Sequence, residues 1–144
     1  MSRVLMLAAA ACCCAWSGAS AQVAAEKPLH VAHVAGYVVD TAGKPVVDVE
    51  VTLVKDDKVA YKTATDNSGA FHFEHVLGHY WFRVARTQNA PAVREIHVGD
   101  LVESYLERKK LYVIVGPGAC ADACSSVYTS KSEFEKAIKK KNRH

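Results

Sequence analysis

The sequence predicts a mainly β protein, an antiparallel Greek-key-type β-sandwich followed by a short C-terminal α/β extension. From about residue 30 to residue 98, apolar and polar residues alternate with a period of two, as they do in half-buried strands. These runs are short and are separated by turn clusters rich in Gly, Asn and Asp, which is typical of antiparallel sheets packed in two layers. Beyond residue 98 the period becomes helical in places, and this change indicates the extension.

The first 21 residues have the pattern of a secretory signal peptide and not of a folded element. Arg3 provides the positive start, the apolar run extends from Val4 to Trp16, and Ala19-Ser20-Ala21 has the form of a cleavage site. The run is shorter than the roughly 20 apolar residues that span a bilayer. We therefore expect cleavage after Ala21 and a mature chain that is periplasmic or secreted. Lipoprotein processing at one of the cysteines at positions 12–14 is the alternative.

Six strands are expected in the sandwich, which we assign to residues 22–98. In the second strand, Val47, Val49, Val51 and Leu53 alternate with polar residues, so these four side chains should face the core. Turns separate the strands, and Gly69 in the third turn is suited to a positive φ. The expected strand ranges are 30–40, 47–53, 59–65, 70–75, 79–86 and 93–98.

The extension, residues 99–144, opens with a helix signal and a strand signal. Asp100 and Glu103 have the spacing of an acidic capping box, and an apolar helical stripe follows over residues 101–106. The apolar run 111–115 indicates a buried strand that ends at the Gly-Pro-Gly sequence of residues 116–118.

The last expected helix begins at a second capping box, formed by Ser130 and Glu133. Its apolar stripe is formed by Phe134, Ala137 and Ile138. Positive charges at the end of a helix complement its dipole. Contact with an anionic membrane is the alternative role for these charges. The basic residues concerned are Lys136, Lys139, Lys140, Lys141 and Arg143.

Cys120 and Cys124 are the two cysteines that remain after the expected cleavage. Because the chain is bound for an oxidising compartment, we expect them to form a disulfide. Residues four apart in a regular helix hold their β-carbons about 5–6 Å apart, which is wider than the roughly 3.8 Å of a disulfide, so the bridge requires a turn. A redox or metal-binding pair is the alternative, although the spacing is not Cys-x-x-Cys.

Residues 71–82, "FHFEHVLGHYWF", are expected to form a β-hairpin whose outer face carries the candidate ligand-binding residues. If Phe71, Phe73, Tyr80 and Phe82 face the core, the residues between them face outward. In such a hairpin two imidazoles and a carboxylate could just converge on a divalent ion. A solvated face without a metal is the interpretation that we favour. The outward candidates are His72, Glu74, His79 and Trp81.

Two further features bear on binding. Trp81 is expected either to lie under the C-terminal helix or to be exposed as a platform on which a sugar ring stacks. His30 and His33 are three residues apart, so they should lie on opposite sides of their strand and not form a site.

Three segments of the chain carry a family pattern. They are a Gly-x-Val strand followed by Asp, Gly and Pro-Val, then Thr-Asp-x-x-Gly-x-Phe, then Gly-x-Tyr at the start of a strand. The matching positions are Gly36, Val38, Asp40, Gly43, Pro45, Val46, Thr65, Asp66, Gly69, Phe71, Gly78 and Tyr80. With them, residues 35–98 resemble the carboxypeptidase regulatory-like domains, which share a sandwich with transthyretin.

The resemblance implies a non-catalytic accessory β-sandwich of the kind often attached to exported enzymes or outer-membrane receptors. Some relatives in the transthyretin group hydrolyse 5-hydroxyisourate and end in Tyr-Arg-Gly-Ser. This sequence ends in "KKKNRH", so that activity is not transferred to it.

The sequence thus predicts a non-catalytic binding or interaction module of the cell envelope, with no cofactor and an unknown protein or glycan partner. A carbohydrate- or metal-binding domain that uses the outer face of the 71–82 hairpin is the alternative, and a hydrolase ranks last. No Ser/His/Asp arrangement, catalytic carboxylate pair or phosphate loop stands out. A net charge of +3 is too balanced to indicate nucleic-acid binding.

Overall fold

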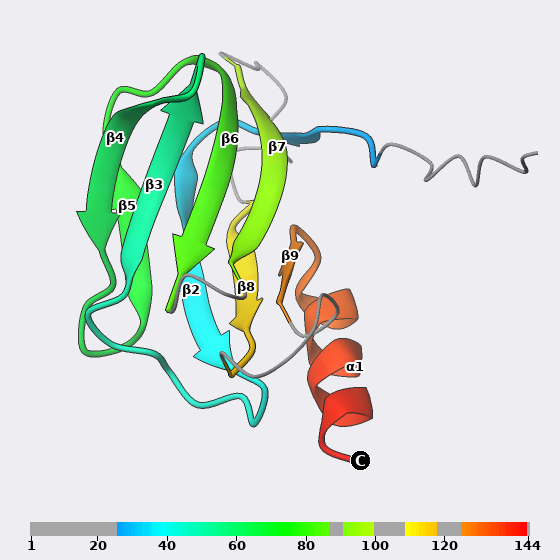
Figure 1. The fold of residues 1–144 in the computed structure, drawn as a ribbon. Helices are drawn as coiled ribbons and strands as arrows, with labels where there is room; N and C mark the ends of the chain where they lie inside the picture. The colour runs from blue at the N-terminus through cyan, green and yellow to red at the C-terminus, as the bar shows by residue number, and fades with distance from the viewer. Residues whose placement is uncertain (1–25, 87–90, 100–108, 118–124, 144) are drawn as a thin grey trace, which may run out of the picture.

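The computed structural model describes residues 26–86, 91–99, 109–117 and 125–143, which form a two-layer β-sandwich with one helix (Figure 1). The first sheet has the strand order β1-β7-β6-β3-β4, and the second has the order β5-β2-β8-β9. The mainly β sandwich expected from the sequence is confirmed. The elements are β1 (Leu29–Val31), β2 (Val34–Asp40), β3 (Glu50–Lys55), β4 (Lys58–Ala64), β5 (Ala70–Phe73), β6 (Gly78–Ala85), β7 (Ala92–Val98), β8 (Leu111–Val115), β9 (Ser126–Tyr128) and α1 (Lys131–Lys141).

The sheets are mixed and not purely antiparallel. β1 runs parallel to β7, and β2 runs parallel to β8, while the other pairs are antiparallel. The first expected strand, residues 30–40, is in fact two strands in different sheets. Alternation shows which side chains point to one face, but it contains no information on strand direction or on a change of sheet within one run.

The expected core strand over residues 47–53 begins later than predicted. Asp48 has a positive φ of 55°, and this left-handed residue interrupts the alternation. As a result Val47 is 48% exposed, whereas its neighbours Val46 and Val49 are buried. From β3 onward the prediction is correct, because Val51 and Leu53 are fully buried.

Two of the expected turns have clear local causes. Asp56 and Asp57 both have positive φ, 51° and 60°, as in the two-residue hairpin turns that match strand twist. In the next turn one carboxylate oxygen of Asp66 accepts hydrogen bonds from the Ser68 hydroxyl and from the backbone N–H groups of Ser68 and Ala70. These bonds lower the pKa of Asp66. Gly69 has a φ of 75°, as expected.

Thr65 is a buried polar residue that joins the loop before β3 to the end of β4. The Val49 N–H donates to the Thr65 hydroxyl oxygen (2.9 Å), and the hydroxyl donates to the Val46 carbonyl oxygen (2.7 Å). Thr65 is 4% exposed, so both backbone groups depend on this side chain in a place with little access to water.

β8 belongs to the sandwich, although the boundary expected at residue 98 assigned it to the extension. It lies in the middle of the second sheet between β2 and β9. Its side chains Leu111, Val113 and Val115 are fully buried in the main core. β2 and β8 approach so closely that a Cβ at Gly36 would collide with the Leu111 carbonyl oxygen, which explains a glycine inside a strand.

The C-terminal helix packs on the outer side of the second sheet (Figure 1). The Glu133 N–H donates to the Ser130 side chain, which confirms the expected N-cap. Phe134 is buried against Tyr112 of β8, with ring centroids 5.2 Å apart. Ala137 and Ile138 pack in the same small cluster, as the apolar stripe predicted.

Among the residues that the structure describes, no helix is long and apolar enough to cross a membrane. The expected signal peptide, the Asp100–Glu103 helix signal and the Cys120–Cys124 pair lie outside the described residues.

Thr65→Val tests the buried hydroxyl, because valine keeps the shape but leaves the Val49 N–H and the Val46 carbonyl oxygen without their partner. We expect the free energy of unfolding to fall by about 1–3 kcal/mol, measured by urea denaturation. The matched control is Thr63→Val in β4, a half-buried position, for which a change below about 0.5 kcal/mol is expected. Equal effects at the two positions would contradict this role of Thr65.

Candidate functional site

The 71–82 stretch does not form a hairpin, so the predicted ligand-binding face is divided between two sheets. β5 pairs with β2 in the second sheet, whereas β6 pairs with β3 and β7 in the first. The chain crosses between the layers over residues 74–77, with His75 and Gly78 at positive φ of 53° and 114°. The expected hairpin is therefore wrong, and so is the expected convergence of two imidazoles and a carboxylate on its outer face.

The prediction of which side chains face inward is confirmed. Phe71, Tyr80 and Phe82 are buried, and Phe73 packs against the core. The rings of Phe71 and Phe82 lie 5.5 Å apart across the two layers. Tyr80 donates its hydroxyl to the Leu77 carbonyl oxygen (3.0 Å) and so holds the crossing segment. Burial, followed by the nearby Tyr61, raises the pKa of Tyr80.

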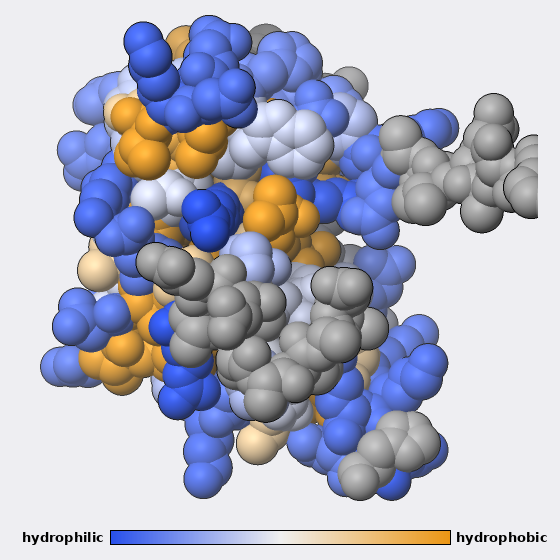
Figure 2. Space-filling model, viewed as in Figure 1, coloured by the Kyte–Doolittle hydropathy of each residue, from blue (hydrophilic) through white to orange (hydrophobic). Residues whose placement is uncertain are grey.

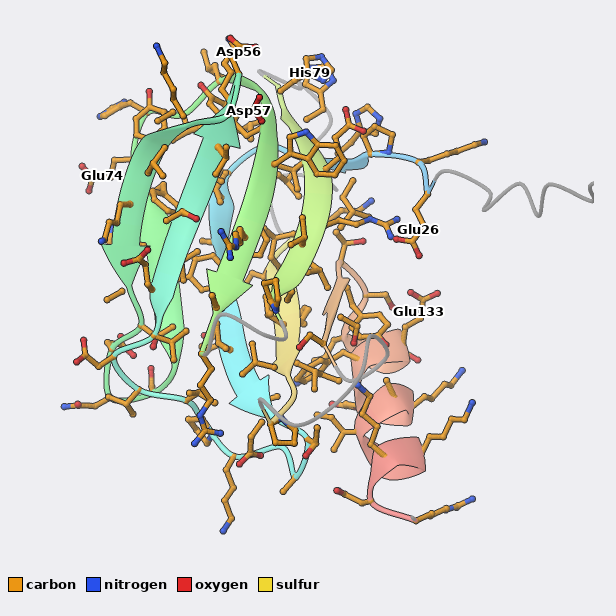
Figure 3. The ribbon with its side chains drawn as sticks, viewed as in Figure 1. Glu26, Asp56, Asp57, Glu74, His79 and Glu133 are labelled. Carbon is orange, nitrogen blue, oxygen red and sulfur yellow. The ribbon has the colours of Figure 1, made fainter. Side chains whose placement is uncertain are left out.

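His72 and Glu74 lie at the second sheet. The His72 Nε2 atom is 3.6 Å from the Glu74 Oε1 atom, and both side chains are largely exposed. Figure 3 shows Glu74 directed away from the sandwich. These two residues, with His33 and His75, line a cavity of about 770 Å³ beside the crossing segment. The contact between His72 and Glu74 joins two solvated groups, so it adds little stability to the fold.

His79 and Trp81 lie on the outer side of the first sheet. The burial of β6 alternates strictly, so both side chains point away from the core. Trp81 is 53% exposed and lies opposite Val54 of β3 and Glu95 of β7. The C-terminal helix packs on the other sheet, so the expectation that it covers Trp81 is wrong. Figure 2, which shows the side of the first sheet, has separate apolar patches among hydrophilic side chains.

Three histidines from three neighbouring strands form a row on this same outer side. In register, His97 of β7 lies opposite His30 of β1 and opposite His79 of β6. The ring centroids of His79 and His97 are 3.9 Å apart, and those of His30 and His97 are 5.2 Å apart. We call His30, His97 and His79 the histidine row. Figure 3 shows His79 at the end of the sandwich where the Asp56–Asp57 turn also lies.

His97 is not among the candidates predicted from the sequence, and His30 is predicted only not to form a site with His33. The outward direction of His97 could have been predicted from the sequence. If Ile96 faces inward, the alternation in residues 93–98 puts His97 outward. The pairing of His30 with His97 was not available, since it depends on a parallel contact between segments 67 residues apart in the chain.

The histidine row shifts the protonation of its central member. The pKa of His97 is lowered, first by desolvation and then by the neighbouring His79 and His30. Each neighbour disfavours the charged form, because adjacent imidazolium groups repel one another. The arrangement favours neutral imidazole at His97.

Two other expected features can be placed. In the described part of the chain, no group of three or more His, Cys, Asp or Glu side chains is already set to hold a metal ion. The basic residues of the helix end partly gather, since Lys136, Lys139, Lys140 and Arg143 line one surface depression of about 420 Å³.

The comparisons with known proteins agree with this fold. A family model described as "Carboxypeptidase regulatory-like domain" matches residues 33–105, which is just over half of the chain. The solved structure of Klebsiella pneumoniae 5-hydroxyisourate hydrolase matches with a TM-score of 0.50 and 14% sequence identity, over 72% of this chain and 96% of the hydrolase chain. At this identity the likeness shows a shared fold alone. No curated protein matches the sequence.

The exposure of Trp81 predicts a red-shifted fluorescence emission that acrylamide quenches readily. The Trp81 contribution is obtained as the difference between the spectra of the protein and of its Trp81→Phe variant. Folded protein whose difference spectrum is blue-shifted and protected from the quencher would contradict an exposed Trp81.

The lowered pKa of His97 predicts a loss of stability in mild acid. As the pH falls below the ordinary value of 6.5, the unfolded chain takes up a proton at this residue before the folded chain does. The free energy of unfolding should therefore fall until the pH passes the folded-state pKa. Urea denaturation of a His97→Asn variant should show a weaker fall between neutral and mildly acidic pH.

The matched control for this pH effect is His72→Asn, which removes an exposed imidazole on the other sheet. It should retain the pH dependence of the unmodified protein. If the two variants behave alike, the histidine row does not control stability in this range.

Proposed function

The chain belongs to the carboxypeptidase regulatory-like domain family, and we propose that it is a non-catalytic binding module of the cell envelope. In this proposal the binding surface is the outer side of the first sheet around Trp81. The pattern of an export signal in residues 1–21 supports the location. The exposure of a large aromatic side chain on a regular strand supports the role.

The exposed Trp81 is the observation that carries the proposal. It is 53% exposed at the middle of β6, and Val93 of β7 is 48% exposed on the same side. A sheet face that only contacts water usually carries polar side chains at its outward positions. Tryptophan is among the residues that contribute most to protein–protein binding, because it buries a large rigid area.

The surroundings of Trp81 fit a protein partner. Arg83 follows two positions later on the same strand face, and Glu95 lies opposite Trp81 on β7. An aromatic side chain flanked by charges of both signs resembles the apolar centre and polar rim of a transient interface. Because all three residues lie on paired strands, their backbone is already ordered, so binding restricts only their side chains.

A carbohydrate ligand is the second candidate, and the same observation favours it. The exposed indole face could stack on a sugar ring, while Arg83 and Glu95 supply a hydrogen-bond donor and acceptor for its hydroxyl groups. The hairpin-based metal alternative is not retained, because β5 and β6 lie in different sheets.

Trp81→Ala tests the binding surface. The purified protein and the variant are used to capture proteins from a cell-envelope extract, and both are applied to a glycan array. We expect one specific protein or glycan signal to fall at least about tenfold in the variant, which corresponds to roughly 1.4 kcal/mol of binding free energy. Thermal unfolding should change little, because the side chain is exposed.

The matched control is Leu77→Ala, since Leu77 is 61% exposed but lies in the crossing segment, away from the outer side of the first sheet. It should retain the signal that Trp81→Ala loses. A glycan signal that depends on Trp81 would favour carbohydrate over protein. If no captured protein or glycan depends on Trp81, the proposed surface is wrong.

A further inference from the structure

The histidine row places three imidazole side chains next to one another on the outer face of the first sheet. Each of three adjacent strands contributes one imidazole at the same rung, through the registers His30 with His97 and His79 with His97. His30 and His79 are exposed, and His97 is half-buried. Like charges directly opposite one another destabilise a sheet, so a row of three bases does not serve the stability of the fold in acid.

The spacing of the row suits a shared ligand. Residues directly opposite on neighbouring strands have Cβ atoms about 4.5–5.5 Å apart. A tetrahedral ion with metal–nitrogen bonds of about 2.0–2.1 Å holds two nitrogens about 3.3 Å apart. The ring centroids of His79 and His97 are already 3.9 Å apart, and His30 is 5.2 Å from His97 on the other side.

The rings are tilted against one another in the structure and do not surround a common point. The planes of His79 and His97 are inclined by 31°, and those of His30 and His97 by 49°. The outer two side chains, His30 and His79, are exposed, so they can adopt other rotamers. An ion would have to turn these rings, with His97 as the central ligand.

We propose that His30, His97 and His79 form a site for a divalent transition-metal ion of the zinc and nickel class. Imidazole suits these ions, whereas Mg²⁺ and Ca²⁺ prefer oxygen ligands. Three protein ligands leave a position open for water or for a group of a binding partner. This site extends beyond the proposed binding function and does not depend on it.

The test uses untagged protein freed of bound metal, titrated with zinc chloride at neutral pH in a calorimeter. We expect one ion per chain with a dissociation constant tighter than about 1 mM. His97→Ala and His79→Ala should each weaken binding at least about tenfold, and thermal unfolding verifies that each variant is folded. The matched control is His72→Ala, which removes an exposed imidazole beside a carboxylate on the other sheet and should bind as the unmodified protein does.

A second measurement is independent of affinity. Substoichiometric Ni²⁺ should broaden the imidazole NMR signals of the histidine row before those of His33, His72 and His75. Binding weaker than about 1 mM, a loss of less than tenfold in both row variants, or an equal loss in His72→Ala overturns the proposal. Binding that survives His97→Ala and disappears on alkylation of cysteines places the ion on thiols and overturns it as well. The result is separable from the proposed function, because Trp81→Ala should leave zinc binding intact.

Discussion

The passage of the chain from the second sheet to the first, over residues 74–77, is the constraint on which the candidate sites depend. Phe71 and Phe82 lie on either side of this passage, and their rings pack together across the layers. Since both rings point inward, the side chains next to them must point outward on opposite faces of the molecule. His72 and His79, seven residues apart in the chain, therefore belong to different surfaces.

The mixed pairing of the sheets determines which residues meet instead. β1 has only three residues, yet its parallel pairing with β7 brings His30 to His97. The antiparallel pairing of β7 with β6 adds His79. Trp81 follows two residues after His79 on the same strand face, so the histidine row and the proposed binding surface occupy adjacent rungs. An ion in the row would lie close to any partner that contacts Trp81.

The candidate functional residues, which are the histidine row and Trp81, lie on the outer face of paired strands, while the core consists of closely packed apolar side chains. The core contains Val, Leu, Ile and Phe side chains with little exposure, and Thr65 is one of the few buried polar residues in the described part of the chain. Its hydroxyl forms hydrogen bonds with two backbone groups, so its burial destabilises the fold little. Paired strands hold the backbone positions of these residues fixed relative to one another, while the exposed side chains can still change rotamer.

The sequence by itself determined which side chains of the regular strands face inward, where the turns at residues 55–58 and 66–69 lie, and where the last helix begins at Ser130. These features depend on neighbours a few residues away in the chain. It did not determine that the Val47 side chain is exposed, since the left-handed backbone conformation of Asp48 interrupts the alternation. Nor did it determine that residues 71–82 divide between sheets, or that His30 meets His97. Alternation assigns a face to each residue, but the partner strand, its direction and its register depend on contacts between distant segments, and only the packed tertiary structure decides those.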